Sequence, residues 1–259
     1  MPPGLSEETR RRYELIGGSP LLRVTEEQAA CLSGRIGAPV LVGMRLWDPS
    51  IESALDRAGE LGLDRLAVLP LAPYSVLVYF RATEQARGKE SSLGRRVPQI
   101  VSVGEWGTHP ALIDAHARQI GPRISPGDRL ILTAHSLPLV ALRAGDRYET
   151  EVRASAEAVG KRLGVSIDLA FQSQGADGGE WLGPTLRASL ERAKADGIGR
   201  VVVAPFGFLC DHVETLYDLD HEARGWAGEL GLEFVRVPAL GTADGLIDAM
   251  EDLARRALT

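Results

Sequence analysis

Short apolar runs rich in β-branched residues alternate with helical patterns along almost the whole chain. The stretch from Arg200 to Ala204, for example, is an arginine followed by three valines and an alanine. Strands that alternate with helices are typical of an α/β protein with parallel sheets. The predicted strands are Val40–Met44, Arg65–Leu69, Gln99–Val103, Arg129–Thr133, Asp168–Phe171, Arg200–Ala204 and Glu233–Val237.

The segments between these strands carry apolar residues at helical spacing. Thr25 followed by Gln28 is a capping-box signature, which places a helix start at Thr25. The predicted helices are Thr25–Arg35, Ser50–Leu61, Ala111–Ile120, Glu149–Leu163, Pro184–Ala195, His212–Leu230 and Ala243–Leu258.

A glycine- and proline-rich stretch at residues 121–127 is the best candidate for a domain boundary. It divides the chain into lobes of similar composition, residues 1–122 and 123–259. A chain of 259 residues is long enough for one large domain or two modest ones. We expect the final helix to pack back on the first lobe.

Composition excludes several classes of protein. A net charge of -6 without a basic block argues against nucleic acid as a partner. With Cys31 and Cys210 as its only cysteines, one chain cannot hold a disulfide framework, a four-cysteine zinc site or a cysteine-ligated iron–sulfur cluster. The longest apolar run, Val68–Phe80, is shorter than the roughly 20 residues that span a bilayer. Residues 1–20 lack a signal-peptide layout, so we expect a cytoplasmic protein.

A histidine follows one of the central predicted strands. His135 comes directly after Arg129–Thr133 and Ala134, and Pro138 prevents regular continuation of the chain. Ligands of open α/β sheets bind beyond the carboxyl ends of the strands. His135 is therefore either a functional imidazole facing that crevice or a structural histidine that caps a turn.

The densest cluster of chemistry-bearing residues follows the strand Arg200–Ala204. If a helix begins near Asp211, then Glu214, Asp218 and Glu222 recur every four residues on one face. We call these three residues the acid ladder. Such a row is either a solvated acidic face or a set of oxygen ligands for a cation, and Asp211 and His212 at the helix entrance favour the second interpretation.

Collinear motifs along essentially the whole chain resemble the ferrochelatase family, which inserts ferrous iron into a porphyrin in haem biosynthesis. The motifs are Tyr13–Leu21, Thr25–Gln28, Gly43–Arg45, Thr133–Pro138, Gln172–Ser173, Trp181–Pro184 and Asp211–Tyr217. The resemblance implies a lyase built from two Rossmann-like lobes, each with a central parallel sheet, and a porphyrin cleft between the lobes.

The resemblance also implies roles for single residues. His135 matches the family's central histidine, which abstracts a pyrrole proton or binds iron, and Glu214 matches the carboxylate opposite it. Asp218 and Glu222 match the acidic line that conducts metal or protons. We therefore predict His135 and Glu214 as catalytic and, together with Asp218 and Glu222, as metal ligands. Predicted substrate contacts are Arg45, Tyr74, Ser136, Gln172, Trp181, Asp211 and His212.

These residue types suit metal insertion. A neutral imidazole accepts a proton or binds Fe(II), and a carboxylate takes a second proton or offers an oxygen ligand. The positive end of the helix dipole should keep Glu214 ionised and His212 neutral. We expect no permanently bound cofactor and no iron–sulfur cluster, with Fe(II) as substrate and Mg(II) as a possible occupant of the acid ladder.

The sequence departs from the family pattern in places. Family members begin with a further strand, a glycine-containing turn and a helical lid before the segment Ile16–Gly18. Either these are encoded upstream of Met1, which we expect, or the chain binds porphyrin weakly and tends to self-associate. Leu46 stands where the family usually has an aromatic residue or a histidine, and Gln174 stands where a basic residue is common. Two alternatives stay open: a chelatase for another metal or tetrapyrrole, and a non-catalytic porphyrin or haem carrier. The choice between coproporphyrin III and protoporphyrin IX, and the oligomeric state, also stay open.

Overall fold

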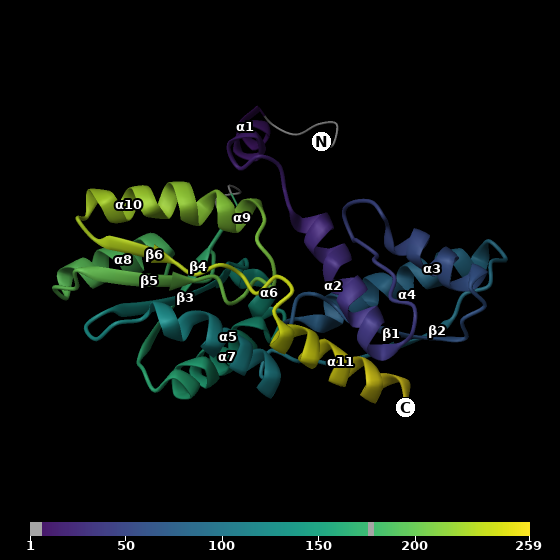
Figure 1. Cartoon of the computed structure of the whole chain (residues 1–259). Coiled ribbons are helices and arrows are strands. Elements are labelled where there is room, and N and C mark those ends of the chain that lie inside the picture. Colours follow the sequence, from purple (N-terminus) through teal and green to yellow (C-terminus); the bar gives the residue numbers. More distant parts are fainter. Residues whose placement is uncertain (1–6, 176–178) are drawn as a thin grey trace. The chain divides into compact units, whose positions relative to one another are not determined.

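The computed structural model describes residues 7–175 and 179–259 and divides the chain into two compact units (Figure 1). Unit 1 comprises Met1–Leu22 and Ile113–Gly241, and unit 2 comprises Arg23–Leu112 and Thr242–Thr259. The predicted boundary after residue 122 therefore falls inside unit 1. The final helix, α11 (Asp244–Leu258), belongs to unit 2, where it contacts both strands of that unit's sheet.

Unit 1 is built on a four-stranded parallel sheet in the order β4-β3-β5-β6. Its strands are β3 (Arg129–His135), β4 (Ile167–Gln172), β5 (Arg200–Ala204) and β6 (Glu233–Arg236). From β3, the chain adds β4 on one side and then β5 and β6 on the other. The direction of winding reverses between β3 and β5, and in such sheets the crevice at this reversal is where ligands bind.

Helices cover both faces of this sheet (Figure 1). On one face, the apolar side chains of α8 (Leu186–Ala195), η2 (Asp218–Ala223) and α10 (Arg224–Glu229) pack on Ile131 and Val203. On the other lie α5 (Pro110–Ile120) and α7 (Tyr148–Leu163). The remaining helical segments of the unit are α1 (Glu7–Leu15), η1 (Gly121–Arg123), α6 (Leu139–Arg143) and α9 (Val213–Leu216).

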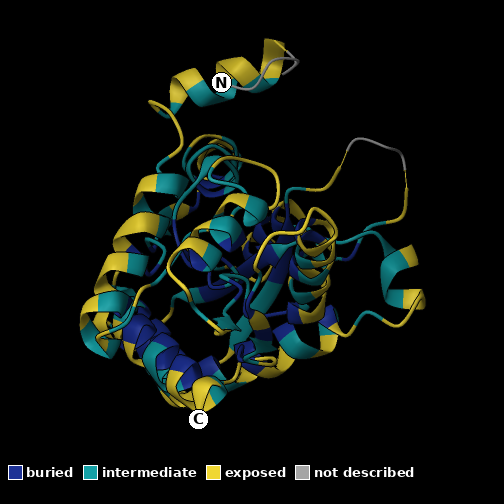
Figure 2. Ribbon diagram, turned by 90° about the vertical axis from the view of Figure 1, so that its right-hand side faces the viewer, coloured by how far each residue is buried: buried dark blue, intermediate teal, exposed yellow. Residues whose placement is uncertain are grey.

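Unit 2 has a two-stranded parallel sheet, β1 (Arg65–Val68) and β2 (Gln99–Ser102). Leu55, Ala86 and Ile100 form its buried cluster. The helix α11 buries one side and exposes the other, as Figure 2 shows beside the C-terminus. The other helices of the unit are α2 (Leu21–Ile36, in this unit from Arg23), α3 (Ile51–Glu60) and α4 (Val76–Ser92).

Two sequence predictions about unit 2 were wrong, and one of its helices was not predicted. Val40–Met44 is no strand, and its one bridge joins Met44 to Ser50. The helix α2 begins at Leu21, so Thr25 lies inside it and is not its cap. The helix α4 was not predicted, because the valines and aromatics of its first turn resemble a strand or a buried turn.

The predicted helix His212–Leu230 is interrupted in unit 1. It consists of the four-residue α9, the π-helical η2 and then α10. Insertions of this kind occur often at functional sites. In the described ranges, no helix is long and apolar enough to cross a membrane.

Candidate active site

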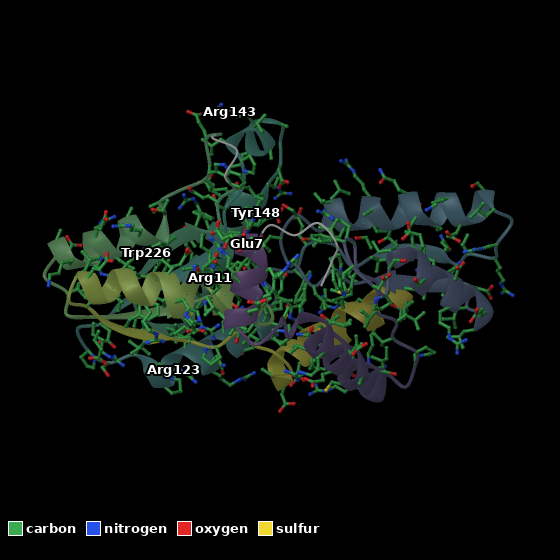
Figure 3. All side chains as sticks on the ribbon, turned by 90° about the horizontal axis from the view of Figure 1, so that it is seen from above. Glu7, Arg11, Arg123, Arg143, Tyr148 and Trp226 are labelled. Carbon is green, nitrogen blue, oxygen red and sulfur yellow. The ribbon has the colours of Figure 1, made fainter. Side chains whose placement is uncertain are left out.

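His135 is the last residue of β3, and the structure places it beside the last residue of β4. His135 and Gln172 are register partners across the two strands. The loop after β3 is fixed by the backbone N–H of Ser136, which donates to the Gln172 carbonyl at 2.7 Å. Tyr148, labelled in Figure 3, donates its hydroxyl to the His135 carbonyl at 2.8 Å. The imidazole therefore projects from a backbone that is held on two sides.

Glu214 contacts this imidazole directly. Its Oε2 lies 3.0 Å from His135 Nδ1, and both side chains are a little over one-third exposed, at 37% and 36%. Burial acts to raise the pKa of the Glu214 carboxyl, but the His135 hydrogen bond and the charges of His135 and His212 outweigh it. The pKa consequently lies below its ordinary value. The ionised state that we predicted is supported, although its cause is the two histidines and not a helix dipole, since α9 has only four residues.

Asp218 and Glu222 continue the acid ladder along η2. On this helical segment Leu219 and Ala223 are fully buried against the sheet, so the residue before each of them lies at the edge of the packed face. The Ser173 hydroxyl donates to Asp218 Oδ2 at 2.5 Å. Burial and the charges of Glu222 and Glu214 raise the pKa of Asp218 to about 6, although the Ser173 hydrogen bond and Arg12 act against them.

Arg12 is a site residue that sequence reasoning missed. It comes from α1, and its guanidinium lies 3.9 Å from Asp218 and 3.8 Å from Glu222. It also covers the ring of Tyr217, with 4.6 Å from Cζ to the ring centroid. The available signal was the basic run Arg10–Arg12 in a helix, but nothing in the sequence connects that run to acids near the other end of the chain.

Asp211 and His212 organise the entrance of α9. The carboxylate of Asp211 pairs with both terminal nitrogens of Arg236 and accepts a hydrogen bond from the Thr215 hydroxyl at 2.9 Å. His212 Nδ1 accepts from the Glu214 backbone N–H at 3.2 Å and caps the helix. Burial lowers the pKa of His212 despite the nearby charges of Glu214 and Asp211, which keeps the ring neutral as expected.

Two predicted substrate contacts lie at the loop after β3. Ser136 is fully buried, and its hydroxyl donates to the Leu182 carbonyl at 2.8 Å, so it braces the loop. Trp181 is half-buried and forms a bridge with Pro138. A side chain at Gly175 would come within 2.5 Å of the Trp181 ring, which explains the glycine there.

Arg45 and Tyr74 belong to unit 2. Arg45 is exposed and lies over the ring of Tyr79, 5.7 Å from its centroid. Tyr74 is only 3% exposed and packs so closely on Gly107 that a side chain there would meet its ring at 2.3 Å. Within unit 2, Arg45 is exposed, whereas Tyr74 is part of the core.

The predicted metal ligands do not form one closed site. Among the described residues, no group of three or more histidine, cysteine or acidic side chains is placed to hold an ion. His135 and Glu214 form one pair, and Asp218 and Glu222 share Arg12. Burial and the charge of Asp211 raise the pKa of Cys210 to about 12, so this thiol is not available as a thiolate ligand.

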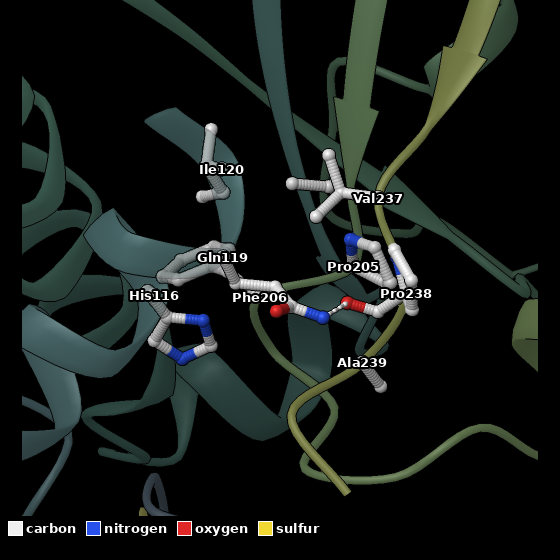
Figure 4. A pocket seen from close by; sticks show the side chains of 9 residues that line it. His116, Gln119, Ile120, Pro205, Phe206, Val237, Pro238 and Ala239 are labelled. Carbon is white, nitrogen blue, oxygen red and sulfur yellow. Dashed lines mark hydrogen bonds between the residues drawn. The ribbon is translucent and has the colours of Figure 1, made fainter. Parts of the chain in front are cut away.

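A small pocket in unit 1 lies apart from these residues. Its lining, drawn in Figure 4, includes His116 and Phe206 together with Gln119, Ile120, Ala204, Pro205, Val237, Pro238 and Ala239. Burial lowers the pKa of His116 to about 4, and the lining contains no acid. This pocket therefore lacks the residues that metal insertion needs.

Comparison with known proteins agrees with the motifs. The ferrochelatase family model matches residues 3–258. The chain is 34% identical to a ferrochelatase of Thermus thermophilus, over 98% of this chain and 89% of that protein. It is 33% identical to a ferrochelatase of Acidobacterium capsulatum, over 100% of this chain and 86% of that protein, and 34% identical to one of Aquifex aeolicus, over 96% and 83%.

Solved structures of chelatases share the fold. SirB from Bacillus subtilis with Fe3+ superposes with a TM-score of 0.70 at 14% identity, covering 91% of this chain and 88% of that one. CbiX, described as the terminal enzyme of sirohaem biosynthesis in denitrifying bacteria, gives 0.60 at 17%, covering 93% and 95%. At these identities the likeness concerns the fold alone. The family match and the full-length relatives show that the chain belongs to the ferrochelatase family, the lyases that insert iron into porphyrin.

Proposed function

We propose that the His135–Glu214 pair is where this ferrochelatase exchanges pyrrole protons for iron. The observation that carries the proposal is the 3.0 Å hydrogen bond between His135 Nδ1 and Glu214 Oε2, formed beyond the carboxyl ends of β3 and β5. The pair thus flanks the point where the winding of the sheet reverses, which is the ligand-binding position of open α/β sheets.

The hydrogen bond and the lowered pKa of Glu214 together support one protonation state for the pair. An ionised carboxylate can only accept, so His135 Nδ1 carries the proton and donates it to Glu214. The other ring nitrogen, Nε2, then has a lone pair. That lone pair can take a pyrrole proton or bind Fe(II), for which imidazole is a suitable ligand.

Metal insertion is a balanced exchange without a redox step. Two N–H bonds of the porphyrin break, two protons leave, and four nitrogen–iron bonds replace water on Fe(II). His135 accepts the first proton at Nε2, and the ionised Glu214 stabilises the imidazolium that forms. The resulting charge pair returns to its starting state when the proton passes to solvent, and the second pyrrole proton then leaves by the same route through His135.

We further propose that the acid ladder supplies the cation. Carboxylate oxygens suit a hydrated divalent ion, and the ion pairs of the Arg12 guanidinium with Asp218 and Glu222 support a preference for positive charge at this position. An arriving ion would replace Arg12 there, and Mg(II) is a suitable stand-in for Fe(II) at this position. Protonation of Asp218 near pH 6 would weaken the ladder below that pH.

The test is anaerobic metallation of the parent protein. Fe(II) and Co(II) are each offered with coproporphyrin III, protoporphyrin IX and a more polar tetrapyrrole, and the absorbance change is followed. Insertion of Fe(II) into a porphyrin supports the proposal. Preference for another metal or tetrapyrrole favours a related chelatase, and binding without metallation would indicate a carrier.

We also propose that the protein works in the cytoplasm. Cys31 and Cys210 are both free thiols, as suits a reducing compartment. Cell fractionation followed by immunodetection tests this, and recovery of the protein in an oxidising compartment would contradict it.

A further inference from the structure

Gln172 contacts the backbone at or beside both members of the His135–Glu214 pair. It ends β4 opposite His135, and its backbone carbonyl accepts from Ser136, the residue after that histidine. Its side chain is 5% exposed. The backbone of Gln172 therefore holds the strand end that carries His135, while the residue itself lies inside the protein.

The Gln172 side chain reaches the other half of the pair. Its Nε2 donates to the Glu214 backbone carbonyl at 2.5 Å, and only the amide nitrogen can donate to a carbonyl. Glu214 needs such an anchor, because α9 has four residues and continues into the π-helical η2. A helix this short is not stable through its own hydrogen bonds.

The acceptor end of the same amide is unsatisfied. Gln172 Oε1 is buried and accepts no hydrogen bond within the residues that the structure describes. Burying a polar atom without a hydrogen-bond partner costs stability, so packing alone does not explain why an amide side chain occupies this position. The anchor to Glu214 supplies that reason.

We propose that Gln172 is a positioning residue that sets the separation of His135 and Glu214, and that it does not contact the porphyrin. The backbone of Gln172 fixes one member of the pair, and its side chain fixes the other. This inference rests on the proposed role of the pair and replaces the predicted substrate contact of Gln172.

The variant that tests it is Gln172→Met, which keeps the length of the side chain and removes the N–H donor. Gln174→Met makes the same change two residues further along, at an exposed position, and is the matched control. Iron insertion is measured at varied iron and porphyrin, porphyrin affinity by fluorescence quenching, and stability by thermal unfolding.

For Gln172→Met we expect kcat to fall about 10- to 100-fold, with KM for both substrates and porphyrin affinity within about twofold of the parent. Gln174→Met should match the parent. Gln172→Asn keeps the amide but is one methylene too short to reach Glu214, so it should lose kcat as well. A raised porphyrin KM at parent kcat would overturn the proposal in favour of substrate contact, and lower stability at parent kcat would overturn it in favour of a structural role.

A crystal structure of Gln172→Met separates this inference from the proposed function. We expect the His135 Nδ1 to Glu214 Oε2 distance to exceed hydrogen-bonding range in the variant, and an unchanged distance would overturn the positioning role. The role of the pair itself fails on a different result, namely parent turnover in Glu214→Gln.

Discussion

Unit 1 and unit 2 differ in how completely their sheets are packed. In unit 1, four of the five residues of β5 are buried, and β3 is buried from Leu130 to Ala134. In unit 2, β1 has no buried residue and β2 has one. A fully packed sheet holds the residues at its strand ends in fixed places, and that is where unit 1 places His135, Gln172 and the loop that leads to Glu214.

Unit 2 also carries most of the exposed large apolar side chains of the described chain. Leu46 is 83% exposed and Leu77 is 54% exposed, close to Arg45 and Tyr79. Under the proposed function, proton and metal chemistry depend on unit 1, whereas unit 2 offers apolar surface and a positive charge. Paired changes in the two units test this division.

The largest expected effect comes from comparing a histidine in each unit. His135→Ala should reduce iron insertion about 100- to 10,000-fold with little change in thermal stability, because the side chain is partly exposed at a strand end. His109 in unit 2 bonds Asp252 at 2.8 Å, so His109→Ala should cost about 1 kcal/mol of stability and leave kcat unchanged. Enzyme assays and thermal unfolding measure both, and near-normal turnover in His135→Ala would remove it from the mechanism.

Breaking the Arg236–Asp211 pair should destabilise unit 1. Arg236 is 9% and Asp211 22% exposed, so Arg236→Met leaves a mostly buried carboxylate with only Thr215 as its partner. We expect a loss of about 3 kcal/mol in urea unfolding. The double variant Arg236→Met/Asp211→Asn should recover part of that loss, and no recovery would show that the charge is not the cause.

Asp218→Asn should stabilise the protein near pH 7.5. Because the folded-state pKa of about 6 exceeds the ordinary 3.8, the folded protein binds more protons than the unfolded chain between these values. The ionised group therefore disfavours folding once the pH rises through 6. We expect the free energy of unfolding of Asp218→Asn to exceed that of the parent by about 2 kcal/mol at pH 7.5 and to change little at pH 4, as measured by denaturant unfolding.

The same Asp218→Asn variant should require several times more iron at unchanged porphyrin KM, because it removes a charge from the acid ladder. Asp64→Asn in unit 2 is the control, because the Asp64 side chain is 88% exposed. The stability of this variant should stay within about 0.5 kcal/mol of the parent protein at both pH 4 and pH 7.5. Parent-like iron dependence in Asp218→Asn would show that the ladder is a solvated helix face.

The smallest effect is expected at the exposed surface of unit 2. Val76 is 2% exposed and Leu77, next to it, 54%. Val76→Ala should lower the free energy of unfolding by about 2 kcal/mol, whereas Leu77→Ala should change it by no more than about 0.5 kcal/mol. Denaturant unfolding of the two variants measures this difference, and equal costs would mean that Leu77 is covered in solution.

The strands of unit 1 could be predicted because short apolar runs, such as the three valines of β5, alternate with helical patterns. His135 could be singled out by its place at a strand end and Glu214 by the four-residue spacing of the acid ladder, whereas the roles of both came from the resemblance to the ferrochelatase family. Val40–Met44 looks similar, but a strand needs a neighbour, and in the described structure only Met44 makes a bridge.

What could not be predicted depends on tertiary packing. Arg12 contacts the acid ladder because α1 belongs to unit 1. The next residues of the chain, from Arg23, belong to unit 2, so sequence order does not reveal this contact. The π-helical η2 buries Leu219 and Ala223 on the sheet, a spacing that an ordinary α-helix would also give, so the sequence pattern does not reveal it. Tyr74 and Ser136 have side chains suited to binding, yet both are buried, and residue type alone does not reveal that.

The central claim is that the His135–Glu214 pair performs the exchange of protons for iron. Its most direct test is single-turnover insertion of Fe(II) by Glu214→Gln at saturating porphyrin and iron, with porphyrin binding followed in the same experiment. Glutamine keeps the shape but loses the charge that stabilises His135. We predict unchanged porphyrin binding with insertion at least about 100-fold slower than the parent. Insertion at the parent rate would contradict the account.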